Sequence, residues 1–260
     1  MVHIESLIIE ATRQCALNCA HCLRGDSEAR SFSAFGKLEK FLKQGVSIDS
    51  LIFSGGEPFL VPEVLLHIIN IMLKYETHVS QIYIATSGVI PNSTIHLQNI
   101  ILTLHKMLEL LKVDGLDILY ESDAPSLLIE LSNSEYHAES REQLNLKIEP
   151  LLALISKKDS RTYKESSLIP IGRAEYLGMR HDKYDAILKS CEKGIEINID
   201  DEEDEVNIPE MYITFDGRCF PECDLSYDMM DDADAYEFKV YTLDEITKII
   251  KKDLRKRNKV

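Results

Sequence analysis

The sequence predicts an α/β fold built on a parallel sheet. Short apolar segments, such as Leu7-Ile8-Ile9 and Leu51-Ile52-Phe53, alternate with segments of helical periodicity over residues 2–120. Strands separated by helices in this way are typical of βαβ units, whose strands run parallel. Cys15, Gly55 and Ser87 each follow a predicted strand. Because functional residues collect at the carboxyl ends of parallel strands, we expect these positions at one edge of the sheet.

The elements of the first half follow from hydrophobic periodicity. A buried strand is a short apolar run, whereas a helix repeats its apolar residues every three or four positions. The segment Pro62–Tyr75 has the broadest apolar face of the predicted helices. The predicted strands are 2–12, 49–53, 81–85 and 116–120, and the predicted helices are 31–43, 62–75 and 93–111.

The middle of the chain carries weaker periodicity. Pro150 interrupts one of its apolar segments, and a proline is disfavoured inside a central strand. With the polar residues after each strand, the elements predict a partial (βα)6 TIM-like barrel over residues 1–185. The predictions for the middle are a fourth helix beginning at Leu127–Leu131, a fifth strand within Lys147–Ile155, an exposed connection or short helix over Ser156–Ser167, and a sixth strand at Leu168–Ile171.

The pattern changes in the last third of the chain. Ile195–Ile199 and Met211–Phe215 alternate like antiparallel strands, and the acidic run Asp200–Glu205 between them predicts a solvated hairpin loop. Thr242-Leu-Asp-Glu245 has the pattern of a capping box and predicts the start of a terminal helix. Residues 186–260 are therefore expected to form a small C-terminal extension, a β-hairpin plus a helix.

Composition and charge restrict the function. The 260 residues include 29 Lys and Arg against 44 Asp and Glu, a net charge of −15. This charge argues against nonspecific binding to nucleic acid or to an anionic membrane surface. The N-terminus has no basic segment followed by a long apolar one, and no apolar run is long enough to cross a membrane, so we expect a cytoplasmic protein. In a reducing compartment the 6 cysteines are expected to be metal ligands or thiols rather than disulfides.

Three of these cysteines lie within eight residues, directly after the first predicted strand. They form the sequence Cys15-Ala-Leu-Asn-Cys19-Ala-His-Cys22. Thiolates are soft ligands suited to iron–sulfur clusters and zinc, and clusters are usually held by four of them. Three thiolates would therefore leave one iron of a cuboidal cluster open.

This C-x3-C-x2-C loop resembles the signature of the radical S-adenosylmethionine (SAM) family. The segment Ser54-Gly55-Gly56-Glu57-Pro58 is similar to the family's Gly-Gly-Glu-Pro turn, and two later segments, 84–88 and 169–174, are similar to its strand ends. The resemblance covers roughly residues 4–180. It implies a partial barrel, a 4Fe-4S cluster at Cys15, Cys19 and Cys22, and SAM bound at the open iron.

The resemblance also implies roles for single residues. Gly55 and Gly56 would let the backbone approach the methionine end of SAM, and Glu57 would accept its ammonium protons. Ser87 ends the strand segment that resembles the family's next SAM-binding turn. Ser122 resembles a polar residue near the ribose or the methionine carboxylate.

Two further positions have competing interpretations. Arg141 is either a partner of the SAM carboxylate or an arginine in a surface ion pair. His21 stands before the third cysteine, where the family commonly has an aromatic residue near the adenine, and an imidazole can also stack there.

A second cysteine set lies in the predicted extension. Cys191, Cys219 and Cys223 resemble a shortened auxiliary-cluster extension of the twitch or SPASM type. The resemblance implies a second iron–sulfur cluster, with Glu222, Asp224 or bound substrate in place of a missing cysteine. The residues alone also allow a structural zinc site or three thiols that bind nothing.

The function that the resemblance implies is that of a radical SAM enzyme. Reductive cleavage of SAM would give a 5′-deoxyadenosyl radical that abstracts hydrogen from a substrate, and relatives with such an extension often act on a peptide or protein side chain. The electron would come from a donor such as flavodoxin or ferredoxin. The alternatives are modification of a nucleotide or small metabolite, and a noncatalytic protein that binds an iron–sulfur cluster or zinc.

Overall fold

A nine-stranded sheet forms the centre of the structure, a computed structural model that describes residues 1–112, 126–132, 135–145, 150, 159–161, 184–200 and 205–257. Its strands are β1 (Val2–Thr12), β2 (Val46–Gly55), β3 (His78–Thr86), β4 (Ser126–Ser132), β5 (Asp159–Arg161), β6 (Asn198–Asp200), β7 (Glu205–Ile213), β8 (Arg218–Phe220) and β9 (Tyr241–Thr242). The helices are α1 (Phe35–Leu42), the short 3-10 helix η1 (Pro58–Leu60), α2 (Pro62–Lys74), α3 (Thr94–Leu111), α4 (Glu135–Gln143), α6 (Tyr184–Lys193), α7 (Tyr227–Asp231) and α8 (Leu243–Arg257).

The first five strands run parallel in the order β5-β4-β3-β2-β1. Their register aligns apolar side chains across the sheet: Leu7 lies opposite Leu51, Leu51 opposite Ile82, and Ile82 opposite Leu127. All four are buried in one hydrophobic cluster. The predicted α/β class with a parallel sheet is therefore confirmed.

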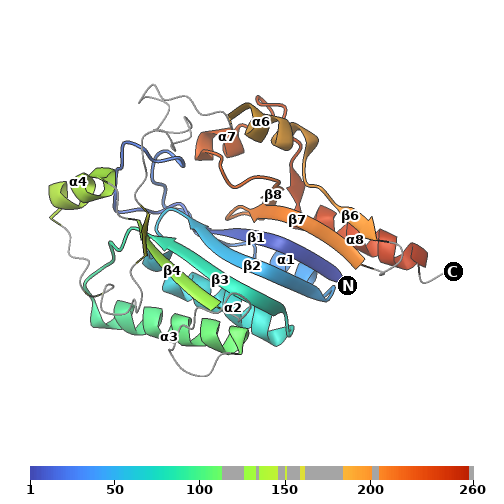
Figure 1. Cartoon of the computed structure of the whole chain (residues 1–260), viewed down its shortest axis with the longest axis horizontal. Coiled ribbons are helices and arrows are strands. Elements are labelled where there is room, and N and C mark those ends of the chain that lie inside the picture. The colour runs from blue at the N-terminus through green and yellow to red at the C-terminus, as the bar shows by residue number, and fades with distance from the viewer. Residues whose placement is uncertain are drawn as a thin grey trace.

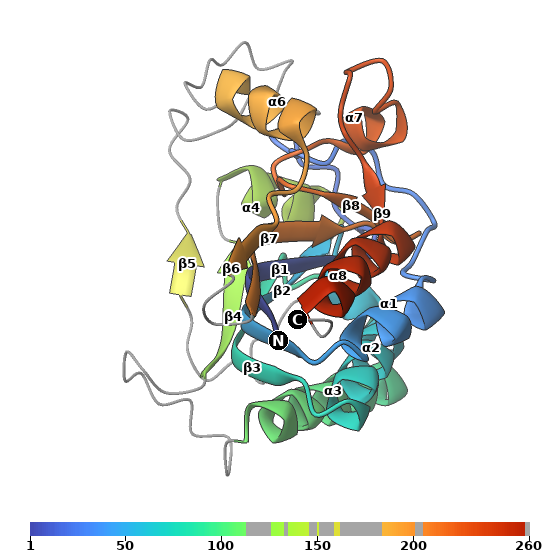
Figure 2. The ribbon, with the colours of Figure 1, turned by 90° about the vertical axis from the view of Figure 1, so that its right-hand side faces the viewer.

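Helices cover both faces of the sheet (Figure 1). Buried residues of α1, α2, α3 and α8 pack with the sheet in the main cluster, which contains Leu38, Ile68, Met107 and Ile246. Figure 2 shows α8 lying beside α1 on this face. The opposite face carries α6 and α7, whose buried residues form a second cluster with Ile8 and other residues of the sheet. Among the described helices, none combines the length and the apolar character needed to cross a membrane.

One predicted element is wrong. Leu127–Leu131 was expected to begin a helix, but these residues lie within strand β4, which pairs parallel with β3. Leucine and glutamate favour helices in isolation. Here the buried position next to β3 decides the conformation, because Leu127, Ile129 and Leu131 alternate into the core.

Several predicted elements lie outside the described residues. These are the strands at 116–120 and 168–171, and, apart from Pro150, the strand within 147–155. Of the connection over 156–167, only residues 159–161 are described, and they form β5 rather than a helix.

The C-terminal segment joins the same sheet. β7 forms the predicted hairpin with β6 and also pairs antiparallel with β8. Its other edge pairs parallel with β1, in a register that runs from Val2 opposite Val206 to Ile9 opposite Ile213. The antiparallel pattern was therefore predicted, whereas the parallel contact with β1 was not.

The predicted capping box begins α8. The backbone amide of Thr242 donates to Glu245 Oε2 over 2.8 Å, and the amide of Glu245 donates to Thr242 Oγ1 over 3.2 Å. Each side chain thus satisfies a backbone donor that the helix leaves open at its first turn.

Candidate functional site

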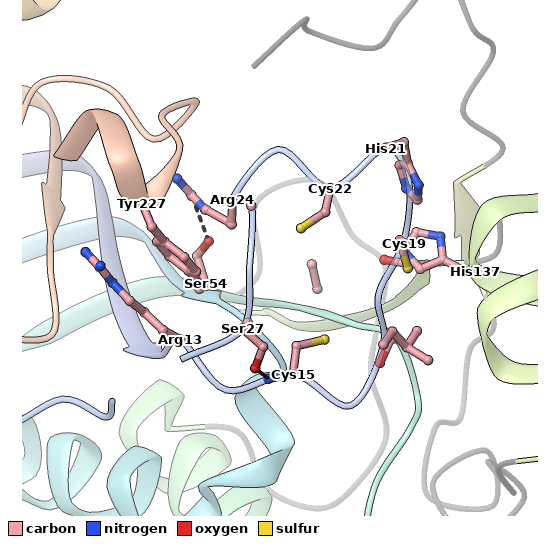
Figure 3. Close-up of a pocket in the computed structure, with 17 residues that line it drawn as sticks. Arg13, Cys15, Cys19, His21, Cys22, Arg24, Ser27, Ser54, His137 and Tyr227 are labelled. Carbon is pink, nitrogen blue, oxygen red and sulfur yellow. Dashed lines mark hydrogen bonds between the residues drawn. The ribbon is translucent and has the colours of Figure 1, made fainter. Parts of the chain in front are cut away.

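A pocket lies at the carboxyl ends of β1, β2 and β3. It holds about 730 Å³ of empty space, part of it open to solvent. Seven residues singled out from the sequence line it, and they come from three separate segments: Cys15, Cys19, His21, Cys22, Gly55, Gly56 and Ser87. Figure 3 shows the three cysteine side chains arranged around this space.

Two hydrogen bonds from backbone amides stabilise the cysteine loop. The amide of Cys22 donates to the carbonyl of Cys19 over 3.1 Å, which forms a turn, and the amide of Cys15 donates to Ser27 Oγ over 2.9 Å. Leu17, Val89 and the three cysteines form a small hydrophobic cluster. Burial, with smaller contributions from the nearby Glu57 carboxyl and the other two thiols, raises the pKa of the Cys15 thiol to about 12.

The arrangement of thiols distinguishes between kinds of metal site. Within the described part of the chain, no three His, Cys, Asp or Glu side chains are placed to hold one metal ion. In an iron–sulfur cluster each thiolate binds a different iron, so the thiols surround a volume rather than a point. Three soft ligands lining one pocket fit that requirement.

Gly55 and Gly56 are needed for the contact between β2 and the cysteine loop. A Cβ on Gly55 would lie 2.1 Å from the carbonyl oxygen of Thr12, and one on Gly56 would lie 2.0 Å from that of Gln14. Gly55 also has a φ of +115°, which L side chains rarely adopt. The sequence predicted that these glycines leave room for a ligand. The structure adds a second close approach, between β2 and the cysteine loop, because the Gly56 amide donates to the Thr12 carbonyl over 2.6 Å.

Glu57 is buried beside the pocket and does not line it. Its Oε1 accepts from the Phe59 amide at 3.1 Å and from Thr86 Oγ1 at 2.7 Å. Its Oε2 accepts from the amide and the hydroxyl of Ser87 at 2.7 and 2.6 Å. A carboxylate has about four lone-pair sites, and these bonds occupy them.

This arrangement changes the interpretation of Glu57. The sequence predicted an acceptor for a bound ammonium group, and that role stays a prediction; the structure adds that the carboxylate accepts from protein donors. Burial raises its pKa, while the hydrogen bonds from Ser87 and Thr86 act in the opposite direction. Glu57 therefore positions Ser87, which does line the pocket.

Helix α4 contributes a histidine that sequence analysis did not single out. The His137 ring lies 4.6 Å from the His21 ring in an edge-to-face arrangement, and both rings line the pocket. Burial lowers the pKa of His137 to about 3, with further lowering from His21 and Arg141, so this imidazole is neutral. Arg141 lies one helical turn later, and its Nη2 donates to the Ser132 carbonyl over 2.5 Å. It does not line the pocket, and Ser122 lies outside the described residues.

The opposite wall is formed by Arg24, Ser54 and Tyr227, which sequence analysis also missed. Arg24 Nη1 donates to the Leu225 carbonyl over 2.6 Å, and its Nη2 donates to Ser54 Oγ over 3.2 Å. Ser54 directly precedes the Gly-Gly pair, and Arg24 lies two residues after Cys22. Their closeness to the two motifs was the only sequence signal that could have identified them. Leu225, whose carbonyl accepts from Arg24, lies 201 positions after it in the chain, so no local pattern predicts the contact.

The second cysteine set is not brought together. Cys191 is buried in the cluster on the α6 and α7 face, and Cys223 packs against that cluster. Cys219 is buried in the main cluster on the other face of the sheet. Glu210 and Glu222 raise the pKa values of the Cys191 and Cys223 thiols, but not that of Cys219. Within the described residues the three thiols are therefore not placed around one metal ion, and a second iron–sulfur cluster stays a prediction.

No protein-family model and no curated protein matches the sequence. Solved structures with similar folds include Streptococcus suis SuiB bound to its precursor peptide SuiA, with 14% identity and a TM-score of 0.38 over 84% of this chain. BtrN in complex with AdoMet and 2-DOIA has 13% identity and a TM-score of 0.41 over 85% of this chain and 74% of that chain. Native anSMEcpe with bound AdoMet and Cp18Cys peptide has 11% identity and a TM-score of 0.41 over 95% of this chain and 79% of that chain. The chain spans 59% of the length of SuiB. Values this low leave the function to be argued from the pocket itself.

Proposed function

We propose that this chain is a radical SAM enzyme that holds a 4Fe-4S cluster through Cys15, Cys19 and Cys22. The observation that carries the proposal is the pocket. It combines the three thiols of one motif with Gly55 and Gly56 of another, although the two motifs are about 40 positions apart in the sequence. The carboxyl edge of a parallel sheet is also where such α/β folds place their active sites.

The cluster would supply one electron that cleaves the sulfonium of SAM, giving methionine and a 5′-deoxyadenosyl radical that abstracts hydrogen from the substrate. The chain's own residues bind and orient. Gly55 and Gly56 keep the end of β2 against the cysteine loop, so that backbone groups of both segments face one volume. Leu17 and Val89 pack against the cysteines and reduce the access of water to that side.

Ser87 and Arg141 are proposed to hold the methionine end of SAM. The Ser87 hydroxyl donates to Glu57 and accepts from the Val89 amide at 3.3 Å, which leaves one lone pair for an ammonium group. The buried Nε of Arg141 has no hydrogen-bond partner among the described residues. Such a donor suits the methionine carboxylate, with Ser122 as the second proposed contact.

The proposed substrate is a peptide or protein side chain, and the proposed electron donor is a flavodoxin or ferredoxin. The substrate proposal depends on the sequence resemblance of residues 186–260 to a twitch or SPASM extension. A single cluster is proposed, because Cys219 lies on the other face of the sheet from Cys191 and Cys223.

The test is made anaerobically. The protein is reconstituted with iron and sulfide, and iron and 5′-deoxyadenosine per chain are measured after addition of dithionite and SAM. We expect about four irons per chain and deoxyadenosine from the wild type, and neither from the Cys15/Cys19/Cys22→Ala variant. Cys219→Ala is the matched control, since it removes a buried thiol outside the pocket, and it should retain both.

Two results would contradict the proposal. A wild type that binds no iron would remove the cluster altogether. A wild type that binds a full cluster but makes no deoxyadenosine, with or without added peptides, would instead indicate a noncatalytic iron–sulfur protein. Turnover of a nucleotide or small metabolite without any peptide would keep the enzyme class and reject the substrate.

A further inference from the structure

The side chain of Tyr227 is the one part of α7 that lines the pocket. The residue is 3% exposed, and its hydroxyl is buried without a hydrogen-bond partner among the described residues. An unsatisfied buried hydroxyl costs about 1–3 kcal/mol, so such groups are usually found where a ligand or a partner completes them. Figure 3 shows the Tyr227 ring on the Arg24 and Ser54 side of the pocket, across from Cys19.

The ring is held firmly in place. The guanidinium carbon of Arg13 lies 4.3 Å from the ring centroid, a cation–π contact, and the Tyr227 amide donates to the Arg24 carbonyl over 2.9 Å. Arg13 and Arg24 both belong to the segment that carries the cysteines. Tyr227 therefore moves with the cysteine loop, although it comes from the C-terminal part of the chain.

The Tyr227 hydroxyl can donate a hydrogen bond, but it has no acceptor among the described residues. A phenol has an ordinary pKa of about 10, so its hydroxyl carries a proton at neutral pH and can donate. Arg13 packs on the ring and Arg24 lines the same pocket, and a guanidinium accepts no hydrogen bond.

Glu10 and Cys22 are candidate acceptors, and Glu10 already accepts two hydrogen bonds. Glu10 accepts from Arg13 Nε at 2.8 Å through Oε1 and from the Tyr212 hydroxyl at 3.1 Å through Oε2. The sulfur of Cys22 also faces the pocket that Tyr227 lines. When Cys22 is a metal-bound thiolate, its sulfur carries negative charge and becomes a better acceptor.

We propose that the Tyr227 hydroxyl donates a hydrogen bond to the Cys22 corner of the bound cluster. This inference depends on the proposed function, since it needs a cluster at Cys22. Hydrogen bonds to cluster sulfurs stabilise the reduced, more negative state and raise the reduction potential. The C-terminal segment thereby sets how readily the cluster accepts its electron.

The experiment measures the midpoint potential of the reconstituted protein by an EPR-monitored redox titration. In Tyr227→Phe we expect the equilibrium constant for one-electron reduction of the cluster to fall by about threefold to tenfold, and the iron content to stay unchanged. A tenfold fall lowers the midpoint potential by about 59 mV. Tyr212→Phe is the matched control. It removes a buried phenol from the same hydrophobic cluster, but that hydroxyl already donates to Glu10 and does not line the pocket, so the potential should stay at the wild-type value.

A second variant tests the same contact without removing the group. Site-specific 3-fluorotyrosine at position 227 makes the phenol a stronger donor and should shift the potential in the positive direction. Unchanged potentials in both variants, with full iron content, overturn the inference. A wild type that takes up no cluster is a separate result and rejects the proposed function instead.

Discussion

The guanidinium of Arg13 donates to both carboxylate oxygens of Asp231, from Nη1 to Oδ2 at 2.6 Å and from Nη2 to Oδ1 at 3.0 Å, although 218 positions separate the two residues. Arg13 is fully buried and lies two residues before Cys15, whereas Asp231 is the last residue of α7. This bidentate pair fixes the start of the cysteine loop to the C-terminal segment.

Asp231→Asn should destabilise the protein. Arg13 would keep Glu10 and the longer contact with Glu28 but lose its bidentate partner, and weakening the pairing of a buried cation is costly. Because Asp231 is 34% exposed, we expect a loss of about 2 kcal/mol, below the usual range for a fully buried pair. Urea unfolding measures it. Asp228→Asn, an exposed change in the same helix, should alter the free energy of unfolding by less than about 0.5 kcal/mol.

Alanine at Gly55 or Gly56 should disrupt the site. The new Cβ would meet backbone oxygens at 2.1 and 2.0 Å, so the cysteine loop must move. We expect a loss of about 3 kcal/mol or more and a reduced iron content after reconstitution. Gly36→Ala is the control, because nothing lies within 4 Å of its Cβ position in α1. It should stabilise the protein by about 0.5–1 kcal/mol, and an equal effect at all three glycines would contradict the steric explanation.

Glu57→Gln tests the carboxylate that positions Ser87. An amide nitrogen would replace one acceptor and face a donor, so at least one buried hydrogen bond is lost. The expected cost is about 1–3 kcal/mol in urea unfolding. The exposed Glu142→Gln on α4 should cost almost nothing. If Glu57→Gln is equally harmless, the four hydrogen bonds do not restrain the ends of β2 and β3.

Glu210 should make stability depend on pH. Burial, with smaller contributions from Glu222 and Asp224, raises its pKa from 4.5 to about 7. The folded state therefore binds the proton more tightly than the unfolded state, so this contribution is fully present below about pH 4.5 and is lost as the pH rises to about 7.

The matching variant is Glu210→Gln, which keeps an acceptor for the Cys223 amide. The difference in free energy of unfolding between this variant and the wild type should shift in favour of the variant by on the order of 2 kcal/mol between pH 4.5 and pH 8. This figure is reduced because the side chain is partly exposed. Unfolding at the two pH values measures this gain. The exposed Glu192→Gln on α6 should behave as wild type at both, and an equal gain there would contradict the assignment to Glu210.

Local patterns were enough to predict the first three strands, α2, α3 and the position of the pocket. Each depends on residues close in sequence, and the parallel arrangement then brings Cys15, Gly55 and Ser87 to one edge. The prediction was wrong at strand β4, because a short apolar run is compatible with either a helix or a strand until its pairing with β3 is known.

The rest of the site depends on contacts that no spacing encodes. Cys219 and Cys223 look like one motif, but Cys219 lies within β8, where alternation turns it toward the α8 face, while Cys223 follows the strand on the other face. The wall of Arg24 and Tyr227 likewise exists only because β7 lies beside β1. His137 lay in the part of the chain with the weakest periodicity.

The place of β7 has a consequence for how the chain is made. Until residue 213 has left the ribosome, β1 has a neighbour on only one side, and its other edge offers unpaired backbone groups along Val2–Ile9. Synthesis at about 5–20 residues per second leaves that edge open for roughly 10–40 seconds. During this interval a nascent chain is exposed to edge-to-edge association, so a chaperone that covers extended segments would raise the yield of folded protein.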